Sequence, residues 1–306
     1  MSGPLLGVTL KIAATFAFTL MVTLVKLVAD RLPVGEVVFA RSALGLIPVL
    51  LMLAWQRELP RALRTSHPGG HFLRAIVGTT SMFFWFASLA LLPLPDATAI
   101  NYAGPLICTA LAAILLGEKV RAYRWSAVTI GFLGVLVVLS PHLGGFTSGR
   151  LDGAAVGALY ALGSAFFAAL AMVTIRRLTA TEGTGAIVFY FSGSAALLAL
   201  TTAPFGWVMP SAGDALILLC IGLTGGVGQV LMTQSYRHAE ASVIAPFDYT
   251  SMIWVILLGI LVFDEIPTLT VLAGSAIVVA AGIFVIWRER QLGIERARAR
   301  KANTPS

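Results

Sequence analysis

The sequence predicts an all-α membrane protein of ten transmembrane helices arranged as two inverted five-helix repeats. Its composition, an internal repeat and the placement of its basic residues lead to this prediction. Of the 306 residues, 58% are hydrophobic and 11% are charged, and the mean hydropathy is +0.90. A soluble domain cannot bury that much apolar surface, so the chain is expected to lie in a lipid bilayer.

The internal repeat begins about halfway along the chain. Residues 7–16 align without a gap on residues 157–166, and further on Asp96–Ile100 parallels Glu240–Ile244. Internal duplication of apolar spans is typical of transporters built from two facing halves. The repeat therefore indicates a class of function as well as a fold.

Ten apolar runs are each close to the roughly 20 residues that an α-helix needs to cross a bilayer. The first run is long for a signal peptide and lacks a basic segment before it, so it is interpreted as a retained helix. Proline and glycine lie in the segments between the runs, where helices are expected to end. The predicted spans are 5–28, 35–54, 71–92, 96–116, 123–140, 153–175, 185–203, 212–236, 241–263 and 268–287.

These spans divide into a first repeat over 5–140, a second repeat over 153–287 and a basic tail over 288–306. Five is an odd number, so the second repeat must enter the membrane upside down relative to the first. Inverted repeats of this kind allow one protein to open alternately to either face of the membrane.

The distribution of basic residues predicts the orientation. Cytoplasmic loops carry an excess of Lys and Arg, and ten spans place both termini on the same side. The opposite side holds only Arg31 and Arg150. Both termini and the tail are therefore predicted to be cytoplasmic, with the protein in the inner membrane. The side of the termini holds fifteen basic residues: Arg57, Arg61, Arg64, Lys119, Arg121, Arg124, Arg176, Arg177, Arg237, Arg288, Arg290, Arg296, Arg298, Arg300 and Lys301.

Several other classes are disfavoured. The net charge of +7 comes from short loops and the tail rather than from a nucleic-acid-binding patch. Cys108 and Cys220 lie inside apolar spans, which supports neither a disulfide nor a cysteine metal site. The chain has no Walker, His-Glu-x-x-His or Gly-x-Ser-x-Gly motif, so no cofactor, metal or enzymatic activity is expected. A membrane scaffold without transport activity remains the alternative from outside the transporter class.

The endings of the two repeats carry a further signal. Leu116-Gly117-Glu118 ends the fourth span and Asp264-Glu265 ends the ninth, and each is followed by a glycine-bearing final helix with Gly131 and Gly134 or Gly274 and Gly282. With the Asp96–Ile100 and Glu240–Ile244 segments, this arrangement resembles the ten-helix EamA-type branch of the drug/metabolite transporter superfamily. The resemblance implies a proton- or exchange-driven carrier of small organic metabolites such as amino acids, riboflavin or S-adenosylmethionine. It also implies a cavity walled by the first, third and fourth helix of each half.

Two charged residues deep in the spans are candidate site residues. Arg41 lies about 9 Å and Asp248 about 10 Å from the start of its predicted helix, at 1.5 Å per residue, and the two helices start on opposite sides of the membrane. Ionisable groups at such depth are costly and usually functional. Arg41 is interpreted as a binding or gating cation, or alternatively as half of a structural ion pair. Asp248 is interpreted as a solute contact and as the proton-coupling group.

The remaining candidates are polar or aromatic. Asn101 and Tyr102 lie where the fourth helix is expected to break, at nearly the same position in the repeat as Pro246 in the ninth helix. Breaks at matching positions of two halves indicate a binding site near the midplane of the membrane. Gln229 could donate a hydrogen bond to solute, and Trp85 could offer a stacking surface. Tyr249 could form a hydrogen bond with the solute. Three further cations lie close enough to helix ends to be interpreted as anchors at the membrane interface: Lys11, Lys26 and Arg74.

The function predicted from these residues is secondary active transport of a small organic metabolite across the inner membrane by alternating access. The best single guess for the solute is a flat aromatic molecule such as riboflavin. S-adenosylmethionine or an amino acid is the alternative. Protons are a possible second partner beside the solute and the lipid bilayer, and no nucleic acid is expected. Import versus export and the oligomeric state are left open by the sequence.

Overall fold

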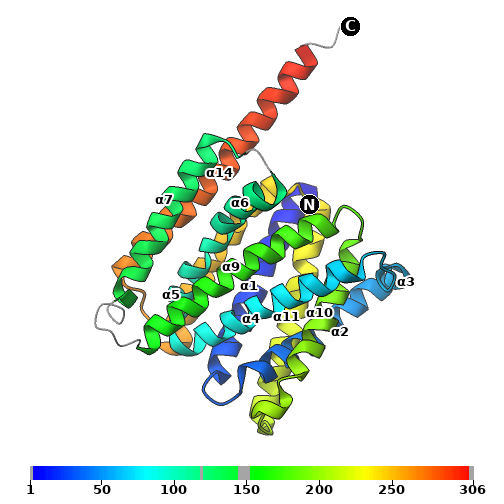
Figure 1. Cartoon of the computed structure of the whole chain (residues 1–306), viewed down its shortest axis with the longest axis vertical. Coiled ribbons are helices and arrows are strands. Elements are labelled where there is room, and N and C mark those ends of the chain that lie inside the picture. Colours follow the sequence, from blue (N-terminus) through cyan, green and yellow to red (C-terminus); the bar gives the residue numbers. More distant parts are fainter. Residues whose placement is uncertain (1–2, 118–119, 144–151, 303–306) are drawn as a thin grey trace.

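The computed structural model describes residues 3–117, 120–143 and 152–302, and helices dominate these ranges (Figure 1). The first half contains, in chain order, α1 (Gly3–Val28), α2 (Val34–Trp55), α3 (Leu59–Ala62), α4 (Pro68–Leu91), α5 (Leu94–Asn101), α6 (Ala103–Leu116), α7 (Ala122–Leu139) and the 3₁₀ turn η1 (Ser140–Leu143). The second half contains α9 (Gly153–Leu178), α10 (Thr184–Leu200), η2 (Ala203–Phe205), α11 (Ala212–His238), α12 (Ala241–Ile244), η3 (Ala245–Thr250), α13 (Ser251–Phe263) and α14 (Leu269–Ala302).

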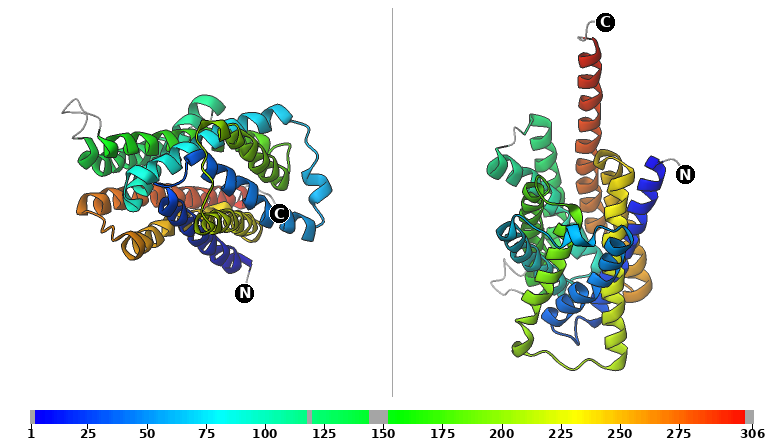
Figure 2. Two further views of the ribbon diagram at one scale, coloured as in Figure 1. Left: turned by 90° about the horizontal axis from the view of Figure 1, so that it is seen from below. Right: turned by 90° about the vertical axis from the view of Figure 1, so that its right-hand side faces the viewer.

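Within the described ranges, nine segments are long and apolar enough to cross a membrane, and α10 is a tenth apolar helix of 17 residues. The ten-helix all-α prediction is confirmed. Glu118, which was predicted to mark the end of the fourth span, lies outside the described residues. The start of α1 and the end of α14 lie toward the same end of the molecule, as an even number of spans requires (Figures 1 and 2).

The helices of the two halves pair according to an approximate two-fold relation. Helix α1 packs on α11, and its repeat counterpart α9 packs on α4. The second helices of the halves, α2 and α10, pack on one another, and so do the last helices, α7 and α14, which Figure 1 shows lying side by side. Each half therefore buries its apolar surface mainly against the other half.

Glycine makes the closest of these approaches possible. A Cβ atom placed on Gly226 of α11 would lie 2.5 Å from the backbone oxygen of Gly45 in α2, which no real side chain tolerates. Transmembrane helices approach this closely where small residues face one another. The Gly45–Gly226 crossing therefore fixes how near α2 can come to α11.

Two matched helices are interrupted, one in each half. The fourth span breaks into α5 and α6 at Tyr102, and the ninth passes through η3 between α12 and α13. Pro246 within η3 lacks a backbone N–H, which prevents a regular α-helix through this segment. Other bounds differ modestly from those predicted: the short α3 was not foreseen, and α14 continues as a helix through the basic tail as far as Ala302.

Candidate solute site

A cavity of about 290 Å³ lies between the first half and the interrupted helix of the second half. It is lined from α1, α4, α5, η3 and α13. Its lining combines hydroxyl, amide, carboxylate and aromatic groups, which is the mixture expected of a site for a small organic molecule. The lining residues are Thr15, Phe18, Thr19, Val22, Trp85, Thr98, Asn101, Tyr102, Asp248, Ser251 and Val255.

The charge at this cavity comes from Asp248 and Lys11. Asp248 Oδ1 lies 2.7 Å from Lys11 Nζ; the lysine side chain is 1% exposed and the aspartate side chain is 51% exposed. Lys11 Nζ also lies 5.1 Å from the ring centroid of Tyr236. The carboxylate therefore faces the cavity while its cation is held behind it in the protein.

This pairing corrects the interpretation of Lys11 as an anchor near a helix end. Lys11 lies eight residues into α1, about 12 Å along the helix at 1.5 Å per residue. That depth matches the depth of Asp248, so the same argument that selected Asp248 could have selected Lys11. Arg41 forms no ion pair with Asp248 in the described part of the chain.

Short hydrogen bonds hold the segment that carries Asp248. The Ser251 hydroxyl donates to the Asp248 carbonyl oxygen at 2.6 Å, which caps the irregular η3 turn. The hydroxyls of Thr15 and Thr250 lie 3.0 Å apart and join α1 to η3. The position of the carboxylate is therefore fixed by both halves of the protein.

The interrupted fourth span supplies the opposite wall. The Asn101 amide donates to the Ser164 hydroxyl at 3.0 Å, and the Tyr102 hydroxyl lies 2.6 Å from that of Ser251. The rings of Tyr102 and Tyr249 pack edge to face with centroids 5.4 Å apart. Tyr249 points toward Gly282 of α14 and does not line the cavity.

Four of the predicted site residues, Trp85, Asn101, Tyr102 and Asp248, therefore line one cavity. Arg41 and Gln229 lie outside its lining. Arg41 packs along Gly225 of α11, one helical turn from Gln229. The roles of all seven predicted residues in solute binding stay predictions.

Lys26 and Glu265 form an ion pair one helical turn beyond the cavity-lining Val22 of α1. Lys26 Nζ lies 2.8 Å from Glu265 Oε1 and also donates to the carbonyl oxygens of Leu89 and Leu92. The second oxygen of Glu265 accepts the backbone N–H of Leu94 at 2.7 Å. These interactions join the end of α1 and the α4–α5 turn to the end of α13, so Lys26 is a link between the halves rather than an anchor to the interface.

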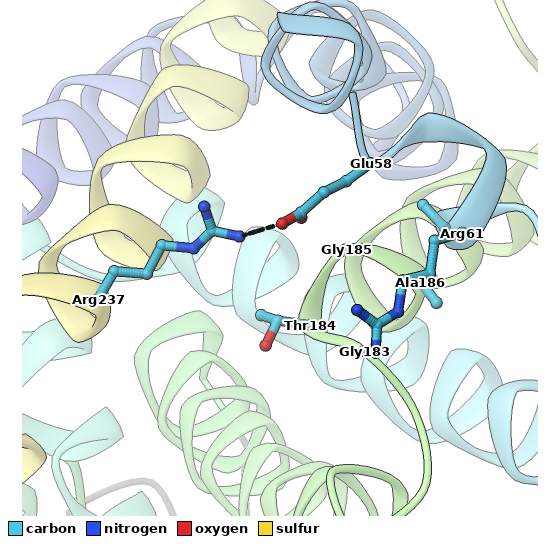
Figure 3. Close-up of a pocket in the computed structure, with 8 residues that line it drawn as sticks. Glu58, Arg61, Gly183, Thr184, Gly185, Ala186 and Arg237 are labelled. Atoms are coloured by element: carbon cyan, nitrogen blue, oxygen red, sulfur yellow. Dashed lines mark hydrogen bonds and ion pairs between the residues drawn. The ribbon is translucent and has the colours of Figure 1, made fainter. Parts of the chain in front are cut away.

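Two other hollows do not suit a transported solute. A hollow of about 190 Å³ lies among α3, the start of α10 and the end of α11, at the ends of the helices, where Arg237 and Glu58 form an ion pair at 2.9 Å (Figure 3). A larger space of about 700 Å³ beside Phe39 and Trp207 is lined almost entirely by apolar side chains. Neither is reached by the interrupted helices.

Comparison with known proteins agrees with this architecture. The pseudopaline exporter CntI of Pseudomonas aeruginosa is 32% identical over 279 residues, which span 90% of this chain and 94% of that protein. The S-adenosylmethionine uptake transporter of Rickettsia prowazekii is 26% identical and spans 87% of each chain. A crystal structure covering 94% of this chain and 98% of its own superposes with a TM-score of 0.65 at 19% identity, which shows the shared fold.

The family profile of EamA-like transporters matches the chain twice, over residues 5–140 and 155–288. Together these two matches cover most of the chain, and the relatives named above are transporters. The chain belongs to the EamA-like transporter family and is a multi-pass membrane transporter.

Proposed function

We propose that this protein is a secondary active carrier that moves a small amino-acid-derived metabolite across the inner membrane by alternating access. The observation that carries the proposal is the Lys11–Asp248 ion pair at the edge of the cavity, with the lysine buried and the carboxylate open to the cavity. A carboxylate placed in this way attracts an ammonium group. Neighbouring hydroxyl and amide groups can orient the rest of a polar solute.

The relatives support this substrate class over the aromatic one. One is an exporter of pseudopaline and another takes up S-adenosylmethionine, and none of those named here is a riboflavin carrier. Riboflavin is therefore without support as the solute. S-adenosylmethionine and amino acids stand as candidates, and transport in either direction is compatible with the same architecture.

Proton coupling follows from the chemistry of the ion pair. Protonation of Asp248 removes its charge and with it the attraction to Lys11, which weakens the packing of α1 against η3. Carboxylates at membrane depth commonly act as proton relays in carriers. We infer that solute and proton act on the same ion pair, and that this ion pair joins the two halves.

The excess of basic residues on one side supports an orientation with both termini in the cytoplasm. A fluorescent protein that folds only in the cytoplasm should therefore fluoresce when fused after Ser306. Absence of fluorescence with normal membrane insertion would reverse the proposed orientation.

The decisive experiment uses purified protein in liposomes with radiolabelled S-adenosylmethionine, a panel of amino acids and riboflavin. We expect saturable counterflow of an amino-acid-derived solute and none of riboflavin. Asp248→Asn should no longer accumulate solute in response to a pH gradient, and its counterflow should need a higher solute concentration because the ammonium group loses its carboxylate partner. Glu58→Gln, which breaks an exposed ion pair far from the cavity, is the matched control. Unchanged pH-driven accumulation in Asp248→Asn would remove the coupling role of that residue.

A further inference from the structure

Two arginines lie at membrane depth without an acidic partner in the described part of the chain. Arg41 of α2 and Arg74 of α4 form neither an ion pair nor a hydrogen bond with the residues that the structure describes. The carboxylates with described ion-pair partners bind other cations: Asp214 binds Arg31, Glu58 binds Arg237, Glu265 binds Lys26, Asp248 binds Lys11, and Asp96 and Glu182 face histidines. Unpaired charge at this depth is costly and points to a partner that is not part of the protein.

The setting of Arg74 leaves most of its donors unused. Its Cζ atom lies 3.8 Å above the ring centroid of Phe191, and its Nε and Nη1 atoms are buried with no hydrogen-bond acceptor among the described residues. A guanidinium is planar and presents five donors, so stacking on one aromatic ring leaves its edge free for an anion. The missing side chain at Gly78 leaves the space that Nη1 occupies.

Arg41 of α2 packs against α11. A Cβ atom placed on Gly225 would lie 3.6 Å from Arg41 Nε and 2.7 Å from Met21 Sδ, so Arg41 fits into the space that a glycine of α11 leaves open beside α1. Gln229 lies one turn along α11 from Gly225, on the same face of the helix. Its side-chain amide makes no hydrogen bond within the described residues and is only partly buried.

Helices α2 and α4 pack against one another, so the two arginines lie on neighbouring helices. Arg74 also lies eleven residues before Trp85, or about three turns, so the two side chains share one face of α4. Trp85 lines the cavity described above. One face of α4 therefore carries Arg74 and, about three turns further along, the cavity-lining Trp85.

We propose that Arg41 and Arg74 form an anion subsite that holds the carboxylates of the transported solute, with Gln229 as a further donor. This inference rests on the proposed transport function and adds the substrate class. Two uncompensated cations are balanced by two negative charges, and paired guanidinium donors match the planar geometry of carboxylates. The solute is therefore an amino-acid-derived molecule with two or more carboxylates, whose ammonium end is available to Asp248.

The first test measures binding without transport. Citrate, with three carboxylates, should raise the melting temperature of the purified protein in detergent, whereas the uncharged propane-1,2,3-tricarboxamide should not. Arg41→Gln and Arg74→Gln should each weaken the apparent citrate affinity by about 10- to 100-fold, the change expected on removal of a charge-assisted hydrogen bond. The control Arg31→Gln, which alters an exposed cation, should leave the citrate response unchanged. An equal citrate response in the wild type and both glutamine variants would overturn the proposal.

The second test separates this proposal from the transport function. In proteoliposomes, citrate should inhibit counterflow of the transported amino-acid-derived solute in an Arg41- and Arg74-dependent manner, and the tricarboxamide should not. Transport with no arginine-dependent effect of citrate would overturn the subsite and leave the carrier function intact. Arginine-dependent citrate binding without transport of any solute in the panel would support the subsite and reject the substrates proposed above. Arg74→Lys, which keeps the charge but not the fork, should bind citrate with intermediate affinity and covers the case in which Arg74→Gln does not fold.

Discussion

At the scale of single residues, the Lys11–Asp248 ion pair has the most direct consequences. The lysine is buried in α1 of the first half and the aspartate lies in η3 of the second half, so the pair is a bond between the halves. Removing one partner of this half-buried pair leaves an uncompensated charge, whereas removing both does not. The two substitutions are therefore expected to be strongly non-additive.

A double-mutant cycle tests this pair. Lys11→Met alone should destabilise the protein because Asp248 is left without its cation, and adding Asp248→Asn should restore part of the stability. We expect a coupling energy of about 0.5–3 kcal/mol in the free energy of unfolding, the range for residues in one ion-pair network, toward its lower end because the Asp248 side chain is half-exposed. The measurement is denaturant unfolding of the four proteins in detergent micelles. Additive effects of the two substitutions would contradict a direct interaction.

Single residues also show what the sequence could predict about the site. Depth along a helix selected Asp248, and matched helix breaks selected Asn101 and Tyr102, which line the same cavity. Depth also applied to Lys11 and Arg74, but both lay near enough to predicted helix ends to pass for interfacial anchors. Which cation meets which carboxylate depends on helix rotation and on packing between halves, which a single sequence does not specify.

At the scale of elements, the crossing of α2 and α11 depends on glycine. Gly226→Ala should destabilise the protein because its new methyl group would overlap the Gly45 carbonyl, 2.5 Å away. Gly193→Ala in α10 is the matched control, since nothing lies within 4 Å of a Cβ atom there. The higher helix propensity of alanine, worth up to about 1 kcal/mol, should then make Gly193→Ala neutral or stabilising. Thermal unfolding of both variants measures the contrast, and equal effects would contradict the close crossing.

The α9–α10 turn is fastened to the α3–α4 turn through Glu182. The carboxylate accepts hydrogen bonds from the Thr65 and Ser66 hydroxyls and from the backbone N–H groups of Ser66 and His67, at 2.9–3.1 Å. Burial raises the pKa of Glu182, but these hydrogen bonds outweigh burial and lower the pKa to about 2. The fastening therefore depends on the ionised form.

This lowered pKa predicts a pH dependence. An unfolded glutamate has a pKa of about 4.3, so the folded carboxylate contributes stability above that pH, and the contribution disappears as the pH falls toward 2. Glu182→Gln should lower the melting temperature at pH 7 and match the wild type more closely near pH 3. Melting curves of both proteins across this range provide the test. A constant difference between them would contradict the role of the charge.

Element boundaries were predictable where proline or a long apolar run defined them. Pro246 forecast the irregular segment between α12 and α13, and the break at Tyr102 followed from its repeat position. The four-residue α3 was not foreseen, because a single helical turn leaves no periodic pattern in the sequence. The continuation of α14 into the tail was not foreseen either. The sequence changes there from apolar to charged residues, which predicts the end of the span, but the backbone remains helical.

At the scale of the whole molecule, the two halves are joined by interactions at opposite ends of the helices. Lys26 and Glu265 join the halves at the end that carries the α4–α5 turn. At the other end, Arg177 of α9 donates to the Leu115 carbonyl oxygen at the end of α6, at 2.9 Å. Arg177 follows Arg176, the repeat counterpart of Lys26, so the corresponding helices α1 and α9 each link the two halves near their ends.

Breaking the Lys26–Glu265 ion pair should favour opening at its own end. In a protein with Cys108→Ser, Cys220→Ser and Thr98→Cys, Lys26→Gln should speed labelling by an impermeant maleimide added on the side of the α4–α5 turn. We expect roughly a fivefold increase, equivalent to about 1 kcal/mol for one ion pair.

Arg31→Gln is the control for this experiment, since it breaks another ion pair near the same end of α1. Its labelling rate should match that of the parent protein. Equal rates in the Lys26→Gln and Arg31→Gln proteins would show that the Lys26–Glu265 ion pair does not hold the cavity closed.

The two-fold pairing of α1 with α11 and of α9 with α4 has an energetic consequence for the transport cycle. If the halves exchange conformations, each interaction that breaks at one face is replaced by its counterpart at the other, so the inward- and outward-facing states are nearly equal in free energy. A small bias, such as one proton or one bound solute, then suffices to change which state dominates. The residues that break the symmetry, with Asp248 in the second repeat at the position of Gly104 in the first among them, therefore decide which of the two states is favoured before solute binds.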